Sequence, residues 1–336
     1  MKRILFIFLC VTGLSSAYGQ QRPQYTQYVF NNYLLNPALS GIENYIDTKF
    51  GFRKQWSGID NAPQTGFATV NWSLGSDYLW RNPLSLPDHG DDPMSKNYMQ
   101  NYTASPAHHG VGVTIVSDKA GPLSRTDVNL TYAYHLKLTD RINMSTGIAA
   151  GISRITLDMN QLNLEDPNDP ALKNTIVGQT KPDISLGIWV YGASFFAGAS
   201  MQQVIPQKLS FTTDPNYTTG KEKSHYFITG GYRFFVQEDI AAVPSVMLKY
   251  VSNTPVSVDL NCKFSYKDKL WIGGSYRKDD SFSALAGVNI NKLVNVTYSY
   301  DFTTSELNTA TGGSHEIVLG IQLNKLYGIA SRIPIW

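Results

Sequence analysis

The chain has 336 residues, of which only 16% are charged, and its 28 basic and 26 acidic side chains leave a formal net charge of +2. This balance gives no reason to expect a nucleic-acid partner. There are only two cysteines, Cys10 and Cys262, so a small secreted domain held together by several disulfides is excluded.

Residues 1–19 have the three parts of a secretory signal peptide. A basic start at Lys2 and Arg3 precedes a largely apolar run and then a few small residues, and we expect cleavage after Gly19. Cys10 lies inside the apolar run, which argues against a lipoprotein. Because Lys2 and Arg3 account for the whole net charge, the chain that remains after cleavage is neutral.

Residues 20–42 form a separate N-terminal segment. They are rich in Gln, Asn and Tyr and show no strand-like alternation of apolar and polar residues. The segment contains the stretch Tyr33-Leu34-Leu35-Asn36-Pro37-Ala38.

From residue 43 to residue 324 apolar and polar side chains alternate with a period of two, which indicates β-strands. In residues 128–138 the apolar face consists of Val128, Leu130, Tyr132, Tyr134, Leu136 and Leu138. The opposite face consists of Asn129, Thr131, Ala133, His135 and Lys137. We predict about fourteen strands, at residues 43–56, 62–75, 109–118, 124–138, 141–156, 181–191, 192–203, 223–236, 241–251, 254–266, 269–278, 281–291, 292–303 and 314–324.

A transmembrane β-barrel explains these strands better than a soluble sandwich does. Many of the strands reach the ~10 residues that a membrane-crossing strand requires, whereas sandwich strands have about five or six. Open strand edges in lipid would leave backbone groups unpaired, so we expect an all-β, closed, antiparallel barrel. An even number of strands places both of its ends on the periplasmic side.

The lengths of the connections fit this topology with one exception. Short turns fall on the periplasmic side, at residues 139–140, 191–192, 267–268 and 291–292. Long loops fall on the outside, at residues 157–180, 204–222 and 304–313. The connection 76–108 is long yet periplasmic, and we interpret it as a periplasmic element. Residues 20–42 either plug the lumen or lie against its periplasmic mouth, and residues 325–336 form a periplasmic tail.

Several blocks, in order, resemble the PorP/SprF family of Bacteroidota outer-membrane proteins. These blocks are Asn36-Pro37-Ala38 with Gly41, Gly51-Phe52-Arg53-Lys54-Gln55-Trp56, Ala62-Pro63-Gln64-Thr65, Gly110-Val111-Gly112, Ser117-Asp118-Lys119-Ala120-Gly121-Pro122, Ser124-Arg125-Thr126, Tyr132-Ala133-Tyr134-His135-Leu136 and Asp166-Pro167-Asn168-Asp169-Pro170-Ala171. The resemblance implies an outer-membrane barrel linked to type IX secretion and gliding motility. As partners it implies a secreted adhesin, or its C-terminal sorting domain, and the lipoproteins of the secretion ring.

The candidate partner-binding residues are Tyr33, Asn36, Pro37, Arg53, Trp56, Asp166, Asn168 and Asp169. Arg53 and Trp56 end the first strand on the extracellular side, where they either grip a partner or anchor the barrel at the lipid interface. The acidic residues of the loop 157–180 either bind calcium or simply form turns, and we favour turns.

We predict no catalytic residues, no cofactor and no metal site. No serine-centred motif accompanies the six histidines, and His135, on the polar face of its strand, is expected to be solvated in the lumen. Glycines within the strands, such as Gly147 and Gly187, are expected to allow bends or to make room for a plug.

The leading hypothesis is therefore a non-enzymatic outer-membrane barrel that binds and anchors a secreted adhesin at the cell surface, or that links to the periplasmic lipoprotein ring. The alternative is a plugged outer-membrane transporter for hydrophobic or small solutes. A lipase would need a serine nucleophile that the sequence does not reveal.

Overall fold

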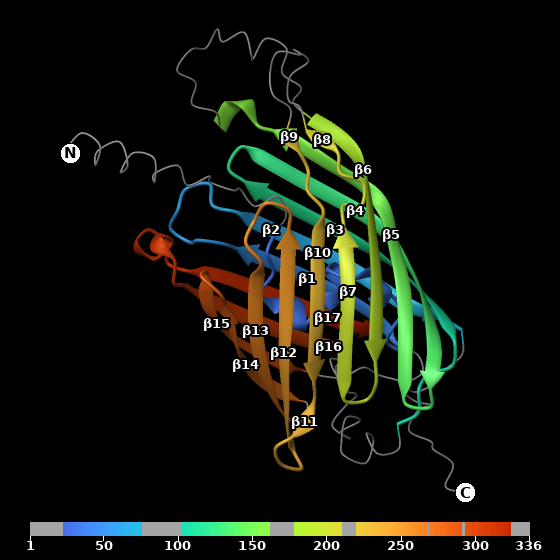
Figure 1. The fold of residues 1–336 in the computed structure, drawn as a ribbon. Coiled ribbons are helices and arrows are strands. Elements are labelled where there is room, and N and C mark those ends of the chain that lie inside the picture. Colours follow the sequence, from blue (N-terminus) through green and yellow to red (C-terminus); the bar gives the residue numbers. More distant parts are fainter. Residues whose placement is uncertain are drawn as a thin grey trace, which may run out of the picture.

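The computed structural model describes residues 23–75, 102–161, 178–209, 220–267, 269–290 and 293–323. Within them the chain forms a closed antiparallel barrel of 14 strands, as predicted (Figure 1). Its strands are β1 (Ile46–Lys54), β2 (Gln64–Leu74), β3 (His108–Ala120), β4 (Leu123–Thr139), β5 (Ile142–Leu157), β6 (Gly178–Tyr191), β7 (Phe195–Gln202), β10 (His225–Tyr232), β12 (Ile240–Val251), β13 (Ser257–Tyr266), β14 (Leu270–Arg277), β15 (Ser281–Asn289), β16 (Val294–Thr303) and β17 (Ser314–Leu323).

Each barrel strand pairs with its neighbours in the sequence, and β17 pairs with β1 to close the ring. Three strands of two residues lie outside this ring. β11 (Phe234–Phe235) pairs with β12, and β8 (Lys208–Leu209) pairs with β9 (Gly220–Lys221). Ile46 pairs with Leu323, so the first and last barrel strands meet at one end. We call this the terminal end of the barrel and the opposite one the distal end; β8 and β9 lie at the distal end (Figure 1).

The burial of side chains is the reverse of that in a water-soluble protein. Along β4, Asn129 and Thr131 are buried in the lumen, whereas Leu130 and Tyr132 are exposed, with Leu130 66% accessible. The same alternation along β13 exposes Leu260, Phe264 and Tyr266. An apolar exterior around a polar interior is the arrangement of a barrel that crosses lipid. No helix among the described residues is long and apolar enough to cross a membrane.

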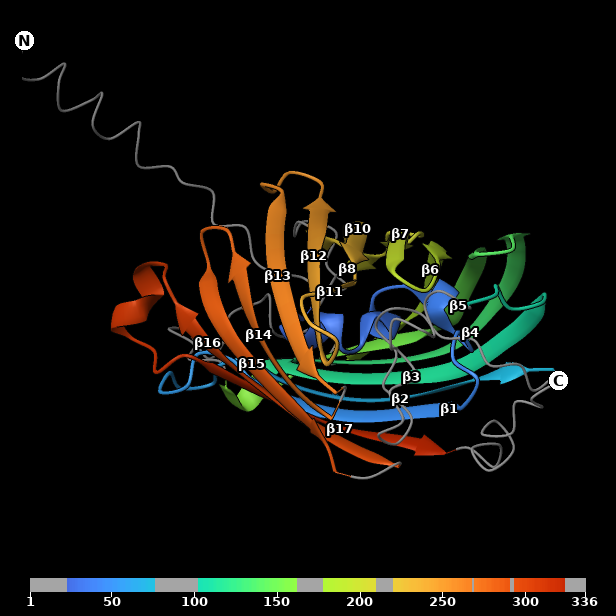
Figure 2. The same ribbon diagram turned by 90° about the horizontal axis from the view of Figure 1, so that it is seen from below.

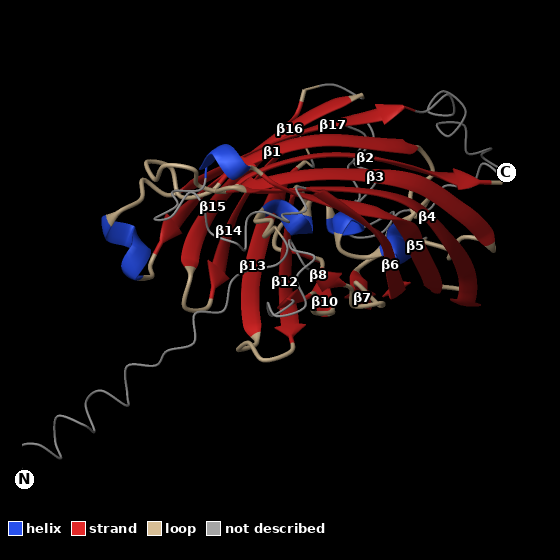
Figure 3. Ribbon diagram, turned by 90° about the horizontal axis from the view of Figure 1, so that it is seen from above, coloured by secondary structure: helices blue, strands red, loops and turns tan. Residues whose placement is uncertain are grey.

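Residues 23–45 lie inside the barrel, and we call them the plug. They form three short 3-10 turns, η1 (Gln27–Val29), η2 (Asn32–Leu34) and η3 (Pro37–Leu39), which Figures 2 and 3 show within the curve of the wall. Thr26 contacts the distal ends of β16 and β17, whereas Gly41 contacts Asn71 near the terminal end of β2. The plug therefore descends the lumen from the distal end to the terminal end.

The long connection between β2 and β3 starts and ends at the terminal end of the barrel, because β2 ends and β3 begins there. Its described part, residues 102–107, packs against the β4–β5 turn, since the backbone N–H of Ala104 donates to the carbonyl of Asp140 at 2.8 Å. β2 and β3 pair directly with each other, so no missed strand separates them in the barrel. The predicted signal peptide, the tail 325–336 and the loop residues Asp166, Asn168 and Asp169 lie outside the described residues.

Candidate functional site

At the distal end the plug is held by a buried cluster of charges. Arg53 of β1 forms ion pairs with Asp301 of β16 at 2.7 Å and with Glu316 of β17 at 3.0 Å. Thr26 joins the cluster because its hydroxyl donates to Asp301 at 2.7 Å and its backbone N–H donates to Glu316 at 2.8 Å. One guanidinium thus faces two carboxylates, and the plug supplies further donors to both of them.

A second ion pair, on β13 and β14, holds Tyr25, the residue just before Thr26. Arg277 of β14 pairs with Asp259 of β13 at 3.0 Å, and it also donates to the carbonyl of Tyr25 at 3.3 Å. Below this pair, Asn261 donates to the hydroxyl of Tyr28. Arginine suits such a position because its planar group can donate to a carboxylate and to a backbone carbonyl together.

Aromatic contacts continue the attachment toward the middle of the lumen. Phe30 stacks on Trp271 of β14 with 6.2 Å between ring centroids, and the ammonium of Lys49 lies 5.3 Å from the Phe30 centroid. Tyr25 packs edge-on against Phe67 of β2 at 5.7 Å. These rings fill space that luminal polar groups alone would leave to water.

From the middle of the lumen to the terminal end the attachment changes to hydrogen bonds between wall side chains and plug carbonyls. The hydroxyl of Ser145 donates to the carbonyl of Ala38 at 2.7 Å, and that of Ser200 donates to the carbonyl of Leu35 at 2.7 Å. The amide of Gln202 donates to the carbonyl of Leu34 at 3.0 Å. Buried backbone carbonyls need hydrogen-bond donors, and the plug does not pair with a strand that would supply backbone N–H groups. Luminal side chains of the wall supply the donors instead.

Glycines in the wall let the plug backbone come this close. Gly147 of β5 and Gly187 of β6 pair across their strands, and the Asn36-Pro37-Ala38 turn sits directly on them. A Cβ on Gly187 would lie 1.9 Å from Asn36 Oδ1, and one on Gly147 would lie 2.4 Å from Ala38 N. The expected room for a plug is therefore present at both glycines.

The side chain of Asn36 explains why the plug turns at Asn36-Pro37-Ala38. Its Oδ1 accepts from the backbone N–H of Ala38 at 3.0 Å, which caps η3, and Pro37 occupies the first position of that turn. Its Nδ2 donates to the carbonyl of Ile188 at 3.1 Å. One side chain thus shapes the turn and ties it to β6.

The prediction of a solvated His135 was wrong. Its side chain is fully buried, because the plug covers it: Nε2 donates to the carbonyl of Ser40 at 2.8 Å, and the hydroxyl of Tyr191 lies 3.1 Å from Nδ1. His108 stacks on His135 with 4.3 Å between centroids. No group of three or more potential metal ligands occurs in the described parts of the chain.

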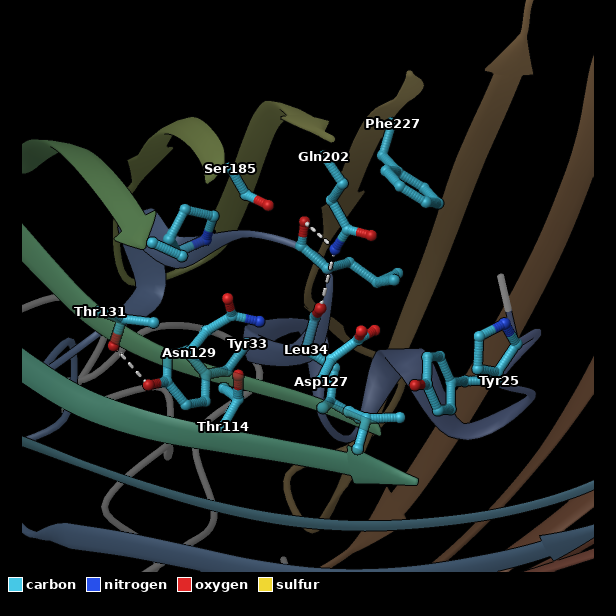
Figure 4. Close-up of a pocket in the computed structure, with 15 residues that line it drawn as sticks. Tyr25, Tyr33, Leu34, Thr114, Asp127, Asn129, Thr131, Ser185, Gln202 and Phe227 are labelled. Atoms are coloured by element: carbon cyan, nitrogen blue, oxygen red, sulfur yellow. Dashed lines mark hydrogen bonds between the residues drawn. The ribbon is translucent and has the colours of Figure 1, made fainter. Parts of the chain in front are cut away.

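A cavity remains between the plug and the distal half of the β3–β7 wall (Figure 4). Together with the open solvent at its mouth, the space measures about 620 Å³. The plug contributes Tyr25, Leu34 and Leu35, and β10 contributes Phe227. The wall contributes mainly polar side chains, namely Thr114, Asp127, Asn129, Thr131, Ser185 and Gln202. The cavity is thus apolar on one side and polar on the other.

The structure places the candidate partner-binding residues in two environments. Tyr33, Asn36, Pro37 and Arg53 are buried in the lumen as parts of the plug attachment. Trp56 is only partly buried, in the distal β1–β2 loop, where its backbone N–H donates to Ser314 Oγ at 3.1 Å. Ser57 in the same loop bonds to Gly312 and Gly313, so this loop and the β16–β17 loop form one distal surface.

The sequence did not predict three features of the site. These are the acidic partners of Arg53, the hydrogen bonds from Ser145 and Ser200 to plug carbonyls, and the stacking of His108 on His135. Each partner lies far from its plug residue along the chain, as Thr26 and Glu316 do with a separation of 290 positions. The only local signal for these plug contacts was the occurrence of glycines within predicted strands together with an N-terminal segment, residues 20–42, in which apolar and polar residues do not alternate.

A model of the family described as type IX secretion system membrane protein PorP/SprF matches residues 17–321. No curated protein matches the chain. Solved structures similar to it include the P. putida toluene transporter TodX, with 8% identity, a TM-score of 0.47 and coverage of 86% of this chain and 92% of that one. The Ralstonia pickettii toluene transporter TbuX has 11% identity, a TM-score of 0.46 and coverage of 87% and 92%. The β domain of the Bordetella autotransporter BrkA has 10% identity, a TM-score of 0.34 and coverage of 83% and 98%.

Proposed function

Because the chain belongs to the PorP/SprF family of type IX secretion outer-membrane proteins, we propose that it is a non-enzymatic docking protein for secreted cargo. The barrel lies in the bacterial outer membrane. In the proposed role it binds an adhesin through the adhesin's C-terminal sorting domain and anchors it at the cell surface. The terminal end of the barrel would meet the periplasmic lipoprotein ring of the secretion machine.

The observation that carries this proposal is the filling of the terminal half of the lumen. Ala38, Ser40 and His135 are each 0% accessible, and the surrounding plug carbonyls are bonded to the wall. A barrel closed in this way is suited to binding at its ends rather than to passing a chain through its middle. The cavity in the distal half remains for a bound partner.

The distal surface is the proposed contact with cargo. Trp56 lies in one of its two loops, and Leu307, 39% accessible, lies in the other, on the short helix η5 (Glu306–Thr309). Aromatic and aliphatic groups on a rim of this kind are frequent anchors in protein interfaces. Tyr33, Asn36, Pro37 and Arg53 would reach a partner only if the plug moved.

Affinity capture from native outer membranes tests the proposal. The tagged protein should recover a polypeptide with a type IX sorting domain, or lipoproteins of the secretion ring, and that sorting domain alone should then bind the purified barrel. A Trp56→Ala variant should weaken binding, while Lys54→Ala, on an exposed side chain of β1, should not. Recovery of neither class of partner would contradict the proposal.

The distal cavity also supports a second candidate, a plugged transporter for hydrophobic or small solutes. Small-ligand sites usually combine an apolar lining with a few polar groups, and the cavity has a lining of this kind. Transport would require the plug to leave the terminal half of the lumen. Swelling of liposomes that contain the barrel in sugar solutions, or ion conductance across planar bilayers, would favour this role; sealed liposomes would argue against it.

A further inference from the structure

The outer face of the barrel carries charge of one sign only. Along the described barrel strands the outward-facing positions hold three lysine or arginine side chains: Lys54 at the distal end of β1, Lys119 at the distal end of β3 and Arg154 near the distal end of β5. Every acidic residue of these strands lies on the luminal face instead: Asp47, Asp118, Asp127, Asp183, Asp259, Asp301 and Glu316. The outward cations are thus confined to the distal end and have no acidic neighbour on their own face.

Two of these cations lie on either side of β4. Arg154 of β5 pairs in register with Thr126 of β4, and Lys119 of β3 pairs with Ser124 of β4, one outward position further toward the distal end. Neighbouring strands are about 4.8 Å apart, so the backbones of Lys119 and Arg154 are separated by roughly 12 Å. Two long side chains can reach one group between them across that distance, and the hydroxyls of β4 lie beneath it.

The described chain does not neutralise these cations. Lys119 and Arg154 are exposed and form no ion pair with any described residue. Asp118, next to Lys119, faces the lumen, and Asp158, just beyond β5, accepts from the amide of Gln161 at 2.7 Å. Exposed cations flanked by hydroxyls suit a phosphate group, which accepts several charge-assisted hydrogen bonds together.

An apolar row adjoins the cations on the same strands. One outward position closer to the terminal end than Arg154, Ile115 of β3, Val128 of β4 and Ile152 of β5 pair in register. Ile115 and Ile152 are 43% and 53% accessible. A phosphorylated lipid fits both features, because its head group can bond to the cations while its acyl chains cover the apolar row. An acidic protein would fit the cations alone.

The terminal ends of the same strands differ from the distal ends. There the outward positions carry aromatic rings: His109 Nδ1 lies 2.8 Å from the hydroxyl of Tyr132, and the His109 ring lies 5.0 Å from that of Tyr134. Lys137, beside the terminal β4–β5 turn, already pairs with Asp140 at 2.7 Å. Aromatic belts occur at both interfaces of membrane proteins, whereas the unpaired cations here mark one end only.

We propose that Lys119 and Arg154 bind a phosphate group of lipopolysaccharide, the phosphorylated glycolipid of the outer leaflet. The hydroxyls of Ser124 and Thr126 donate to the same head group, and Lys54, which lies in one row with Lys119 through Gln64, extends the contact along the barrel. The site places the distal end in the outer leaflet, the orientation that long distal loops predict. It shares only this orientation with the proposed docking function, so either can fail without the other.

A comparison of lipids tests the site on the wild-type barrel. Purified protein in a neutral detergent is titrated into fluorescently labelled lipid A, and the dissociation constant from fluorescence anisotropy is compared with that for dephosphorylated lipid A. The phosphorylated form should bind at least tenfold more tightly, because charge-assisted bonds to phosphate are lost with the phosphate. Equal affinity for the two forms would overturn the site. Phosphatidylglycerol that binds as tightly as lipid A would also overturn it, since any anionic lipid would then suffice.

A pair of matched variants tests the residues. Lys119→Gln combined with Arg154→Gln should weaken the binding of phosphorylated lipid A roughly tenfold, and added salt should reduce the difference from the wild type. Lys137→Gln combined with Arg141→Gln removes the same charge from exposed side chains at the terminal end and should bind like the wild type. Unchanged binding in the first variant, or an equal loss in the second, would contradict the site. The lipid comparison decides the proposal even if a variant does not fold.

Discussion

The plug is attached in two different ways along its length. Its distal part, around Thr26, is held by the Arg53 and Arg277 ion pairs and by aromatic rings. Its terminal part, from Tyr33 to Gly41, is held by neutral hydrogen bonds to its carbonyls and by close contact with glycines. The first attachment depends on charge balance and the second on shape, so different substitutions should break each one.

The largest effect is expected where the distal part depends on one cation. Arg53→Met would leave Asp301 and Glu316 buried without their guanidinium, which typically costs about 3–5 kcal/mol. Urea unfolding of the purified barrel in detergent measures this loss. Adding Asp301→Asn and Glu316→Gln should restore much of it, because the uncompensated charges are then removed. The matched control is Lys54→Met, on the next and exposed side chain; equal stability of the two single variants would refute the charge-balance explanation.

A smaller effect on stability, with a clear effect on conductance, is expected at the wall glycines that contact the Asn36-Pro37-Ala38 turn. In Gly147→Val the new side chain would overlap the backbone of Pro37 and Ala38, since a Cβ already lies 2.5 Å from Pro37 C. Overpacking of this kind costs about 1–3 kcal/mol, and the terminal part of the plug can avoid it by leaving its seat. We expect ion conductance in planar bilayers that the wild type lacks.

The control for this variant is Gly66→Val, at a strand glycine whose Cβ would meet nothing within 4 Å. If Gly147→Val were as stable and as closed to ions as that control, the close fit of the plug would not be what seals the lumen.

The smallest effect separates a bonded hydroxyl from an unbonded one on the same strand. Ser145→Ala removes the donor to the Ala38 carbonyl and should lower the free energy of unfolding by about 1 kcal/mol. Ser153→Ala removes a buried hydroxyl that has no partner and should be neutral or slightly stabilising. Urea titrations measure the free energy of unfolding of both variants. If Ser153→Ala were less stable than Ser145→Ala, the bonds to plug carbonyls would not be what holds the plug.

The strands could be predicted from the sequence because alternation is a local property. Each predicted strand overlaps an observed one, and the differences lie at strand ends; the largest is at β10, which ends at Tyr232 rather than at residue 236. The same alternation identified the luminal face of β4. It did not reveal what that face contacts, and for this reason His135 was expected to be solvated.

The plug contacts could not be predicted in the same way. Residues 20–42 stood out because they lack alternation, and that absence left two positions open for them. Arg53 was interpreted from its place at the end of a strand as an external contact or a lipid anchor, yet its side chain lies on the luminal face between two carboxylates. Nothing adjacent to it in the sequence marks Asp301 or Glu316 as its partners.

The sequence by itself determined an all-β membrane barrel, its strand count and the family resemblance. It could do so because alternation and turn spacing are properties of short stretches of the chain. Only the tertiary structure decided what occupies the lumen. Closure brings β1 beside β17 and brings both beside the plug, so residues almost 300 positions apart share one ion cluster. Contacts across such distances leave no periodic pattern in the sequence.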